Sequence, residues 1–417
     1  MTARLSHVAG ERPQPLAAAP NSVILVINSG SSSIKFALFA AEGLSRLWAG
    51  AINRIGLTKS QFHATDRTGT KIFDKITNVP DHTIALKLLL DAVDRQSSGT
   101  RLLAVGHRVV HGGQRCDCPV LVTRALEVRL RKLNPLAPLH QPHNLAGIAA
   151  VRRARRNIPQ VACFDTAFHH RLPNLARLTA LPRELYNQGI RRYGFHGLSY
   201  EYIVDELRRN EIDVRKELVI LAHLGNGASM CALKDGASIE TTMGFSTLSG
   251  LPMGSRCGDL DPGVLLYLLG KKHMSVQRVQ HLLYEESGLL GLSELSSNME
   301  DLLKQLSKPS VAEAVEFYCY QARRQLAALT ASLGGVDRLV FTGGIGANAP
   351  FIRKQICNGL KYLGIEIDQE RNAEGARLIS SDTGRVAIEA FATDEEMMIA
   401  RHVFHLTVHS GKSTVRN

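Results

Sequence analysis

The segment Val23–Phe39, VILVINSGSSSIKFALF, decides the fold and most of the chemistry expected of this chain. An apolar run, Val23–Ile27, ends at Asn28, and a serine-rich turn around Gly30 leads into a second alternating strand near Lys35. Hydroxyl and N–H groups in such a turn donate to phosphate oxygens, glycine brings the backbone close, and lysine adds positive charge. The pattern therefore predicts a phosphate-binding hairpin. A plain Ser/Gly hairpin turn is the structural alternative, which this segment alone does not exclude.

Two further glycine-rich turns follow predicted strands. Leu218–Lys234, LVILAHLGNGASMCALK, repeats the opening pattern of strand, small polar turn and second strand. Leu339–Phe351, LVFTGGIGANAPF, places Gly343–Gly346 after a strand, and we expect Asn348 to cap a helix with Pro350 in its first turn. Turns of this kind put bare backbone against an anion or a nucleotide. They predict two related domains that each give a phosphate-binding turn to a shared cleft.

Length and composition define the class of protein. A chain of 417 residues is expected to hold two domains, and 44% apolar with 21% charged residues is typical of a soluble globular protein. No run of about 18 apolar residues is present, so we expect no membrane span. We expect residues 1–21 to be a flexible extension rather than a signal peptide, and residues 409–417 to be a flexible tail. Seven cysteines without a regular framework indicate reduced thiols in a cytoplasmic enzyme.

The net charge of +12 admits two interpretations. It could indicate nucleic-acid binding, which shows as a basic patch or stripe. The densest cluster, Arg152–Arg156, closes a predicted helix, Leu145–Arg156, where cations in the last turn complement the helix dipole and face solvent. No aromatic side chains alternate with these arginines, so base stacking has no support. We expect a solvated face that attracts anionic substrates, with neither a nucleic-acid nor a membrane partner.

Strand and helix patterns alternate along the chain, which predicts an α/β fold. The predicted strands are Val23–Ile27, Ile34–Phe39, Leu102–Val110, Gln160–Phe164, Leu218–Leu224, Met230–Lys234, Arg338–Thr342 and Arg385–Ala390. The other predicted helices are Thr83–Gln96, Tyr200–Arg209, Val264–Leu269, Val276–Tyr284, Val311–Leu333 and Glu395–His405.

Polar motifs lie between these elements. They are Gly106–Gly113 (GHRVVHGG), Phe164–His169 (FDTAFH), Arg191–Gly197 (RRYGFHG) and Thr241–Pro262 (TTMGFSTLSGLPMGSRCGDLDP). Each places Arg, His or Asp in a glycine-bounded loop, where side chains are positioned for chemistry rather than for packing. A single Arg or His of this kind is more often structural than catalytic, but the whole set is specific.

Together the motifs resemble the acetate/propionate kinase family of the actin-like ATPase superfamily, over about Val23 to His405. The resemblance implies two duplicated actin-like (ribonuclease H-like) domains around a nucleotide cleft, in a homodimer. Residues 22–166 with 396–408 would form the first domain, and residues 167–395 the second. The implied reaction is reversible, Mg²⁺-dependent transfer of a phosphoryl group from ATP directly to acetate, giving ADP and acetyl phosphate, with Mn²⁺ as an alternative metal.

The chemistry of this reaction explains the residue types. A carboxylate substrate is ionised at neutral pH and needs no general base. Catalysis must align two anions and neutralise charge on the moving phosphoryl group, which calls for a metal ion, arginines and a hydrogen-bonding histidine. The resemblance assigns the grip on the substrates to Arg108 and Arg256. It assigns phosphoryl contact to His196, a further active-site role to His140, and the orientation of a metal-bound water or arginine to Asp165.

The other implied assignments concern the metal, the acyl group and the nucleotide. Asn28 and Glu395 would support Mg²⁺, and we expect Thr393 and Glu396 to form a capping box that leaves Glu395 free for the metal. The acyl pocket would comprise Arg108, Val110, Leu139, Phe195 and Thr247. The nucleotide site would comprise Ser31, Ser33, Lys35, His223, Leu224, Gly225, Asn226, Gly227, Asn298, Met299, Glu300, Gly343, Gly344, Ile345, Gly346 and Asn348.

The sequence departs from the family pattern at a few positions. Thr247 replaces a proline of the acyl pocket, which leaves propionate or another short carboxylate as an alternative substrate. Asn298 and Glu300 stand where the adenosine-side motif has Asp and Arg, and Ala347 replaces an acidic residue, which leaves the phosphoryl donor open. We expect Glu300 either to repel the triphosphate or to lie in solvent after a shift in register that turns a neighbour toward the site.

A non-enzymatic actin-like nucleotide-binding module is the alternative from another class of function. It would share the phosphate-binding hairpins. It would not need Arg108, His196 and Arg256 in glycine-bounded loops.

Overall fold

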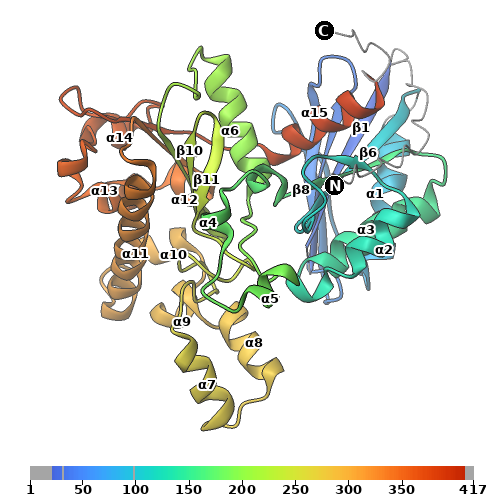
Figure 1. Cartoon of the computed structure of the whole chain (residues 1–417). Helices are drawn as coiled ribbons and strands as arrows, with labels where there is room; N and C mark the ends of the chain where they lie inside the picture. The colour runs from blue at the N-terminus through green and yellow to red at the C-terminus, as the bar shows by residue number, and fades with distance from the viewer. Residues whose placement is uncertain (1–20, 31, 97–98, 409–417) are drawn as a thin grey trace, which may run out of the picture.

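The computed structural model describes residues 21–30, 32–96 and 99–408 of the chain. It contains two β-sheets with helices packed against them, and the two sheet-centred units lie side by side (Figure 1). Apart from Asn21, the expected N-terminal extension and C-terminal tail lie outside the described residues. Among the described residues, no helix has the length and apolar character that crossing a membrane requires.

The first sheet has eight strands in the order β5-β4-β3-β2-β1-β6-β8-β7. β1 is apolar and buried along almost its whole length, as expected of a central strand. It pairs antiparallel with β2 and parallel with β6, which pairs parallel with β8. The strands are β1 (Ser22–Ser29), β2 (Ser33–Ala40), β3 (Arg46–Asn53), β4 (Ser60–Asp66), β5 (Lys71–Thr77), β6 (Arg101–Val109), β7 (Val120–Leu121) and β8 (Gln160–Phe164).

Helices cover both faces of this sheet. One face packs on α1 (His82–Gln96) and α3 (Gln141–Ala154), with α2 (Arg124–Arg131) beside α3. The other face packs on the C-terminal helix α15 (Glu395–Thr407), whose Ile399 and Val403 join Ile24 and Val26 in one core. Figure 1 shows α15, in red, lying across β1. The end of the chain therefore returns to the first sheet, which supports the domain division that we propose from the sequence.

The second sheet has five strands in the order β11-β10-β9-β12-β13. They are β9 (Val219–Leu224), β10 (Ala228–Lys234), β11 (Ala237–Thr241), β12 (Arg338–Thr342) and β13 (Ala387–Ala390). The long helix α11 (Pro309–Leu333) packs on one face, and α6 (Gly197–Arg209) packs on the other. The remaining helices are α4 (Asn174–Arg177), α5 (Arg183–Asn187), α9 (Gly288–Ser293), α10 (Met299–Leu303), α12 (Gly343–Asn348), α13 (Pro350–Cys357) and α14 (Gln369–Glu374).

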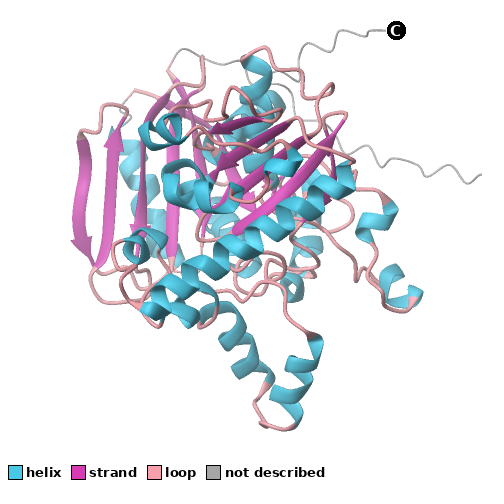
Figure 2. Cartoon of the chain, turned by 90° about the vertical axis from the view of Figure 1, so that its left-hand side faces the viewer, coloured by secondary structure: helices cyan, strands magenta, loops and turns pink. Residues whose placement is uncertain are grey.

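Helices α7 (Pro262–Gly270) and α8 (Val276–Glu285) form an arm that projects away from both sheets (Figures 1 and 2). No residue of α7 is buried, although the helix is largely apolar. Leu266 is 72% exposed and Tyr267 is 52% exposed, and Val276 at the start of α8 is 66% exposed. The arm thus presents an uncovered apolar surface.

The sequence missed the antiparallel strands β3, β4 and β5, which extend the first sheet beyond β2. In β3 the buried residues do not alternate, and β4 and β5 contain few apolar residues, which polar ones separate. Their core is an aromatic cluster in which Trp48, Phe62 and Phe73 contact one another or Phe36.

Some predicted helix ends are wrong. The helix with the arginine cluster ends at Ala154 rather than Arg156. Asn348 is the last residue of α12 and not a cap, because its side chain donates to the Gly344 carbonyl. Pro350 does begin the following helix, as predicted. At α15 the cap is Asp394, which accepts from the Met397 N–H, so the expected Thr393–Glu396 capping box does not form.

Candidate active site

A cavity of about 580 Å³ lies where loops from the two sheets converge. The first sheet contributes the β1–β2 turn and the end of β6, and the second contributes the β9–β10 turn and the turn after β12. Most of the predicted site residues line it: Asn28, Ser33, Lys35, Arg108, Val110, His140, Asp165, Phe195, His196, His223, Gly225, Asn226, Gly227, Thr247, Arg256, Gly343, Gly344 and Glu395.

A second cavity of about 740 Å³ shares part of its wall with the first, at Gly225, Asn226 and Gly344. The other predicted nucleotide residues line this second cavity: Asn298, Met299, Glu300, Ile345 and Asn348. Three predicted residues are described but line neither cavity, namely Leu139, Leu224 and Gly346. Ser31 lies outside the described residues.

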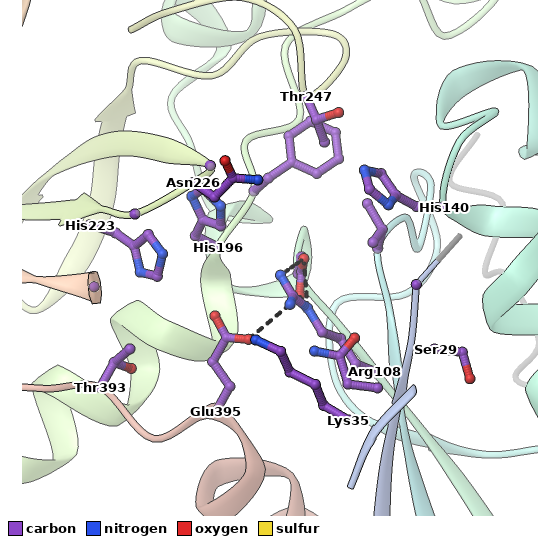
Figure 3. A pocket seen from close by; sticks show the side chains of 18 of the residues that line it. Ser29, Lys35, Arg108, His140, His196, His223, Asn226, Thr247, Thr393 and Glu395 are labelled. Carbon is purple, nitrogen blue, oxygen red and sulfur yellow. Dashed lines mark hydrogen bonds and ion pairs between the residues drawn. The ribbon is translucent and has the colours of Figure 1, made fainter. Parts of the chain in front are cut away.

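Arg108 is held between two carboxylates. Its Nε and Nη2 donate to both oxygens of Asp165 at 2.7–3.1 Å, and its Nη1 lies 3.0 Å from Glu395 Oε2. Figure 3 shows these interactions as dashed lines at the base of the cavity. Burial opposes charge on Arg108, but the two carboxylates outweigh it and raise the pKa of this guanidinium. Glu395 is therefore an ion-pair partner of Arg108, and its role in supporting a metal ion stays a prediction.

Arg256 has a different environment, because none of its described contacts is a carboxylate. Its Nη1 donates to the Thr247 carbonyl at 3.1 Å, and its Nη2 lies 3.4 Å from Nε2 of His140. Burial, with the positive charge of Arg108, lowers the pKa of Arg256. A half-buried guanidinium without a counter-ion favours the binding of an anion beside it.

His196 occupies the turn before α6 with a left-handed backbone, at φ 60° and ψ 22°. This conformation is uncommon for a residue other than glycine, and strain of about 1–3 kcal/mol of this kind is often found at functional sites. Gly197 anchors the turn, since its N–H donates to the Asp165 carbonyl at 2.8 Å. A Cβ on Gly197 would lie only 2.3 Å from that oxygen, so the RRYGFHG and FDTAFH motifs meet only because this residue is glycine.

The rings of His196 and His223 stack with their centroids 4.2 Å apart. Nδ1 of each histidine faces a serine hydroxyl, Ser229 for His196 at 2.8 Å and Ser199 for His223 at 2.7 Å. Burial lowers the pKa of His196 well below its usual value and lowers the pKa of His223 to about 4. Both imidazoles are therefore neutral at pH 7.

Gly343–Gly346, predicted as a turn, instead forms the start of α12 directly after β12, and this glycine segment is fixed from two sides. Gly343 has a φ of 76°, and a Cβ there would lie 2.6 Å from the Leu224 carbonyl oxygen, so only glycine permits this approach. The fully buried Arg353 donates to the carbonyls of Gly346 and Ala347 at 3.0 and 2.8 Å. Ala347, which departs from the family pattern, thus contributes its backbone to the packing of this segment.

The sequence analysis missed several residues at the cavity. Asn144 is buried and joins two strands, because it accepts from the Val110 N–H and donates to the Ser29 carbonyl. Glu396 and Thr393 also line the cavity, although the sequence assigned both to a helix cap. No pattern in the sequence links Asn144 to β1, because the contact joins residues 115 positions apart.

A buried site at the junction of two sheet-centred units, with arginines, neutral histidines and three glycine turns, defines the chain as a phosphotransferase of the actin-like ATPase type. A family model described as the Acetokinase family matches residues 23–401. The chain is 48% identical over 400 residues to an acetate kinase of Rhodopseudomonas palustris, covering 93% of this chain and 98% of the relative.

Two solved structures extend the comparison. The fold matches a Porphyromonas gingivalis acetate kinase with a TM-score of 0.84 at 35% identity, over 92% of this chain and 99% of that one. It matches a propionate kinase from Francisella tularensis with a TM-score of 0.87 at 35% identity, over 91% and 98%. The chain belongs to the Acetokinase family. The predicted family, the actin-like fold and the class of enzyme, a kinase with a carboxyl acceptor, are confirmed.

Proposed function

We propose that this protein transfers the γ-phosphoryl group of ATP directly and reversibly to acetate, giving ADP and acetyl phosphate. The observation that carries the proposal is Arg256, a half-buried guanidinium with no carboxylate among its described contacts, which faces the same cavity as Arg108 and His196. A non-enzymatic nucleotide-binding module would have no need of an uncompensated charge 3.4 Å from the imidazole of His140. In this protein the positive charge of Arg256 is available to bind an anionic substrate.

The hydrogen-bond and ion-pair partners of each side chain indicate its role in phosphoryl transfer. Arg256 takes the anion because its charge is not already neutralised by a carboxylate, whereas Asp165 and Glu395 hold the guanidinium of Arg108 in a fixed position on the cavity wall. His196 is neutral and donates a hydrogen bond to the phosphoryl oxygens. No general base acts, because the attacking carboxylate is already ionised.

Mg²⁺ fits the acidic side of the cavity. Glu395 and Glu396 are adjacent and both line it, and burial together with the charge of Glu395 raises the pKa of Glu396. Two neighbouring carboxylates and the Asn28 amide, all on the wall of the cavity, are oxygen donors that suit a hard cation. Among the described residues no cluster of three or more His, Cys, Asp or Glu side chains could hold a metal alone. This accords with Mg²⁺, which usually binds through one or two carboxylates and the substrate phosphates. When bound, the metal neutralises phosphate charge.

The nucleotide extends from the first cavity into the second. Its phosphates lie against Ser33, Lys35 and the backbone of Gly225–Gly227 and Gly343–Gly344, and its nucleoside lies beside Asn298, Ile345 and Asn348. Lys35 points into the first cavity in Figure 3, as a phosphate contact requires. The shared wall at Gly225 and Gly344 gives the nucleotide a continuous path between the two cavities.

Propionate is the second candidate acceptor. Val110 and Phe195 form an apolar wall of the cavity, and the hydroxyl-bearing Thr247 replaces a proline of the family pattern there. The similarity to a propionate kinase structure also favours this alternative. One additional methylene changes binding in such a pocket by only about 1–3 kcal/mol, so both acids are expected to react.

We also propose that the protein is a cytoplasmic homodimer. All seven cysteines are unpaired, in keeping with a reducing compartment. The exposed apolar residues of the α7–α8 arm, with Leu266 foremost, supply an association surface for a second copy. Leu266→Glu should then give a monomer by light scattering, whereas Leu175→Glu, at an 84% exposed site on α4, should not.

A hydroxylamine assay for acyl phosphate tests the reaction. It should be run over acetate, propionate and butyrate, each with ATP, GTP and pyrophosphate as donors. We expect product with acetate and ATP, less with propionate, and almost none when Arg256 is replaced by alanine. Absence of acyl phosphate with every pair, from folded dimeric protein supplied with Mg²⁺, would refute the proposal.

A further inference from the structure

We propose that Ser229, which Tyr200 contacts, fixes His196 in the tautomer whose Nε2–H faces the reacting phosphoryl group. Ser229 is then a positioning residue for the transfer. The inference rests on the proposed function only for its effect on rate, because the tautomer itself can be measured without substrates.

The three side chains come from two elements that meet behind the cavity. Tyr200 lies one turn after His196 on α6, and its N–H donates to the His196 carbonyl at 3.1 Å. Ser229 lies on β10 and pairs across the hairpin with His223. The Tyr200 hydroxyl lies 2.5 Å from Ser229 Oγ, which in turn lies 2.8 Å from His196 Nδ1. Tyr200 and Ser229 are both fully buried.

Only one placement of the hydrogen atoms gives both hydroxyl hydrogens of Tyr200 and Ser229 an acceptor within this set of contacts. If Tyr200 donates to Ser229 and Ser229 donates to His196 Nδ1, each hydroxyl hydrogen has an acceptor. If Nδ1 instead carries the proton and donates to Ser229, then the hydroxyl hydrogen of either Tyr200 or Ser229 lacks an acceptor among the described residues. An unmade hydrogen bond at a buried hydroxyl costs about 1–3 kcal/mol. The first assignment is therefore favoured, and it places the imidazole proton on Nε2.

Nε2 of His196 faces the cavity. A Cβ on Gly227 would lie 3.1 Å from this atom and 3.9 Å from Nη1 of Arg256, so the absence of a side chain at Gly227 leaves the space in front of Nε2 open. Because burial keeps the ring neutral, its two nitrogens differ: one donates and one accepts. With the proton on Nε2, the ring donates to phosphoryl oxygens. With the proton on Nδ1, it would present a lone pair to them.

Two variants test the proposal, and the first, Tyr200→Phe, changes the packing little, because the ring contacts of Tyr200 with Phe168 and His169 do not need the hydroxyl. In this variant Ser229 still has Nδ1 as the acceptor for its hydrogen, so the Nε2–H tautomer should persist. The second, Ser229→Ala, removes the described partner of Nδ1 and should let the two tautomers approach equal population. The competent fraction is then halved, so we expect kcat to fall about twofold with KM nearly unchanged.

The tautomer is read by ¹⁵N NMR of histidine-labelled protein without substrates, with the His196 signals assigned from the His196→Gln variant. The wild type should show an unprotonated Nδ1 and a protonated Nε2, and Ser229→Ala should move both shifts toward the average. Tyr200→Phe should leave both shifts near those of the wild type.

Tyr318→Phe is the matched control, because it removes another buried tyrosine hydroxyl, one without a described partner, on α11. It should leave the His196 shifts and kcat unchanged. An Nδ1-protonated wild type, or a Ser229→Ala variant with unchanged shifts, would overturn the proposal. Failure of the wild type to make acyl phosphate would instead reject the proposed function and leave the tautomer result standing.

Discussion

The phosphoryl end and the nucleoside end of the site are built differently. At the phosphoryl end, Arg108 and His196 are each fixed by buried hydrogen bonds or ion pairs, and Arg256 is half-buried beside them. At the nucleoside end, the Glu300 side chain is 74% exposed and pairs with Lys304 at 2.6 Å on the surface of a five-residue helix. Fixed geometry is needed where charge moves, whereas the nucleoside only has to be held. Departures from the family pattern are therefore expected to matter less at the exposed end.

Lowering the pH should destabilise the folded protein through the phosphoryl end, and this is the largest effect that we expect. Burial depresses the pKa to about 3 for His140 and to about 4 for His223, which line this end, and to about 4 for His111 and His169, which contact its residue Phe195. The unfolded chain, with ordinary histidine pKa values near 6.5, binds more protons than the folded protein below that pH. Stability therefore falls as pH drops from about 6.5 to about 4, by up to ~1.4 kcal/mol per pH unit for each histidine.

Urea unfolding at several pH values between 7.5 and 4.5 measures this slope. His169→Gln should reduce the slope, and the exposed His273→Gln should not. A free energy of unfolding that stays constant between pH 6.5 and 5 would show that folding does not lower the pKa of these histidines.

Removal of the Arg256 charge should cost at least ~10²-fold in kcat, the scale of one transition-state contact in a preorganised site. Arg256→Ala tests this, and folding should be retained because the lost contacts are to neutral acceptors. Arg256→Lys should restore little, since lysine lacks the planar fork that bonds two groups at once.

Arg278→Ala is a suitable control, because Arg278 lies on α8 and pairs with Glu286 outside both cavities. Its turnover should match the wild type. Wild-type kcat in the Arg256→Ala variant would mean that the uncompensated charge is structural.

The sequence predicted which residues line the phosphoryl end better than it predicted the side chains that contact them. Arg108, His196 and Arg256 stand in glycine-rich motifs whose composition reveals chemistry, and all three line the cavity. Ser229 and Tyr200 lie in an ordinary strand and helix, where a serine or tyrosine carries no signal. Their contact with His196 depends on how α6 packs against the second sheet, which local patterns do not encode.

The same limit applies to the ion pair of Glu395. Nothing in the sequence around this helix start shows that Arg108, 287 positions earlier in the chain, lies against it in the fold. Strands β3–β5 were missed for a related reason, since strands without a regular apolar alternation need their partners before their pattern can be recognised.

Acyl-chain selectivity should change moderately with Thr247. We expect propionate to be used with kcat/KM within roughly two orders of magnitude of acetate, because one methylene is worth ~1–3 kcal/mol. Thr247→Pro should increase the preference for acetate by restoring a rigid apolar wall. Parallel assays of the two acids with both proteins measure the ratio. Complete rejection of propionate by the wild type would show that Thr247 does not widen the pocket.

The smallest effect is expected at Glu300. The sequence allowed either repulsion of the triphosphate or a carboxylate in solvent, and the ion pair with Lys304 favours the second. An exposed ion pair is worth about 0–1 kcal/mol, and salt screens its field. Glu300→Arg should therefore change the KM for ATP by less than about threefold and leave the ATP-to-GTP preference unchanged.

The exposed Glu42→Arg, at the turn after β2 and outside both cavities, makes the same charge change and serves as the control. Measurements at low and physiological salt separate a long-range field from a direct contact, because only the field weakens with ionic strength. A large fall in KM for ATP alone, seen with Glu300→Arg and not with Glu42→Arg, and persisting at high salt, would mean that residue 300 reaches the nucleoside. The nucleoside end would then be built for specific recognition, and the contrast between the two ends would be one of degree.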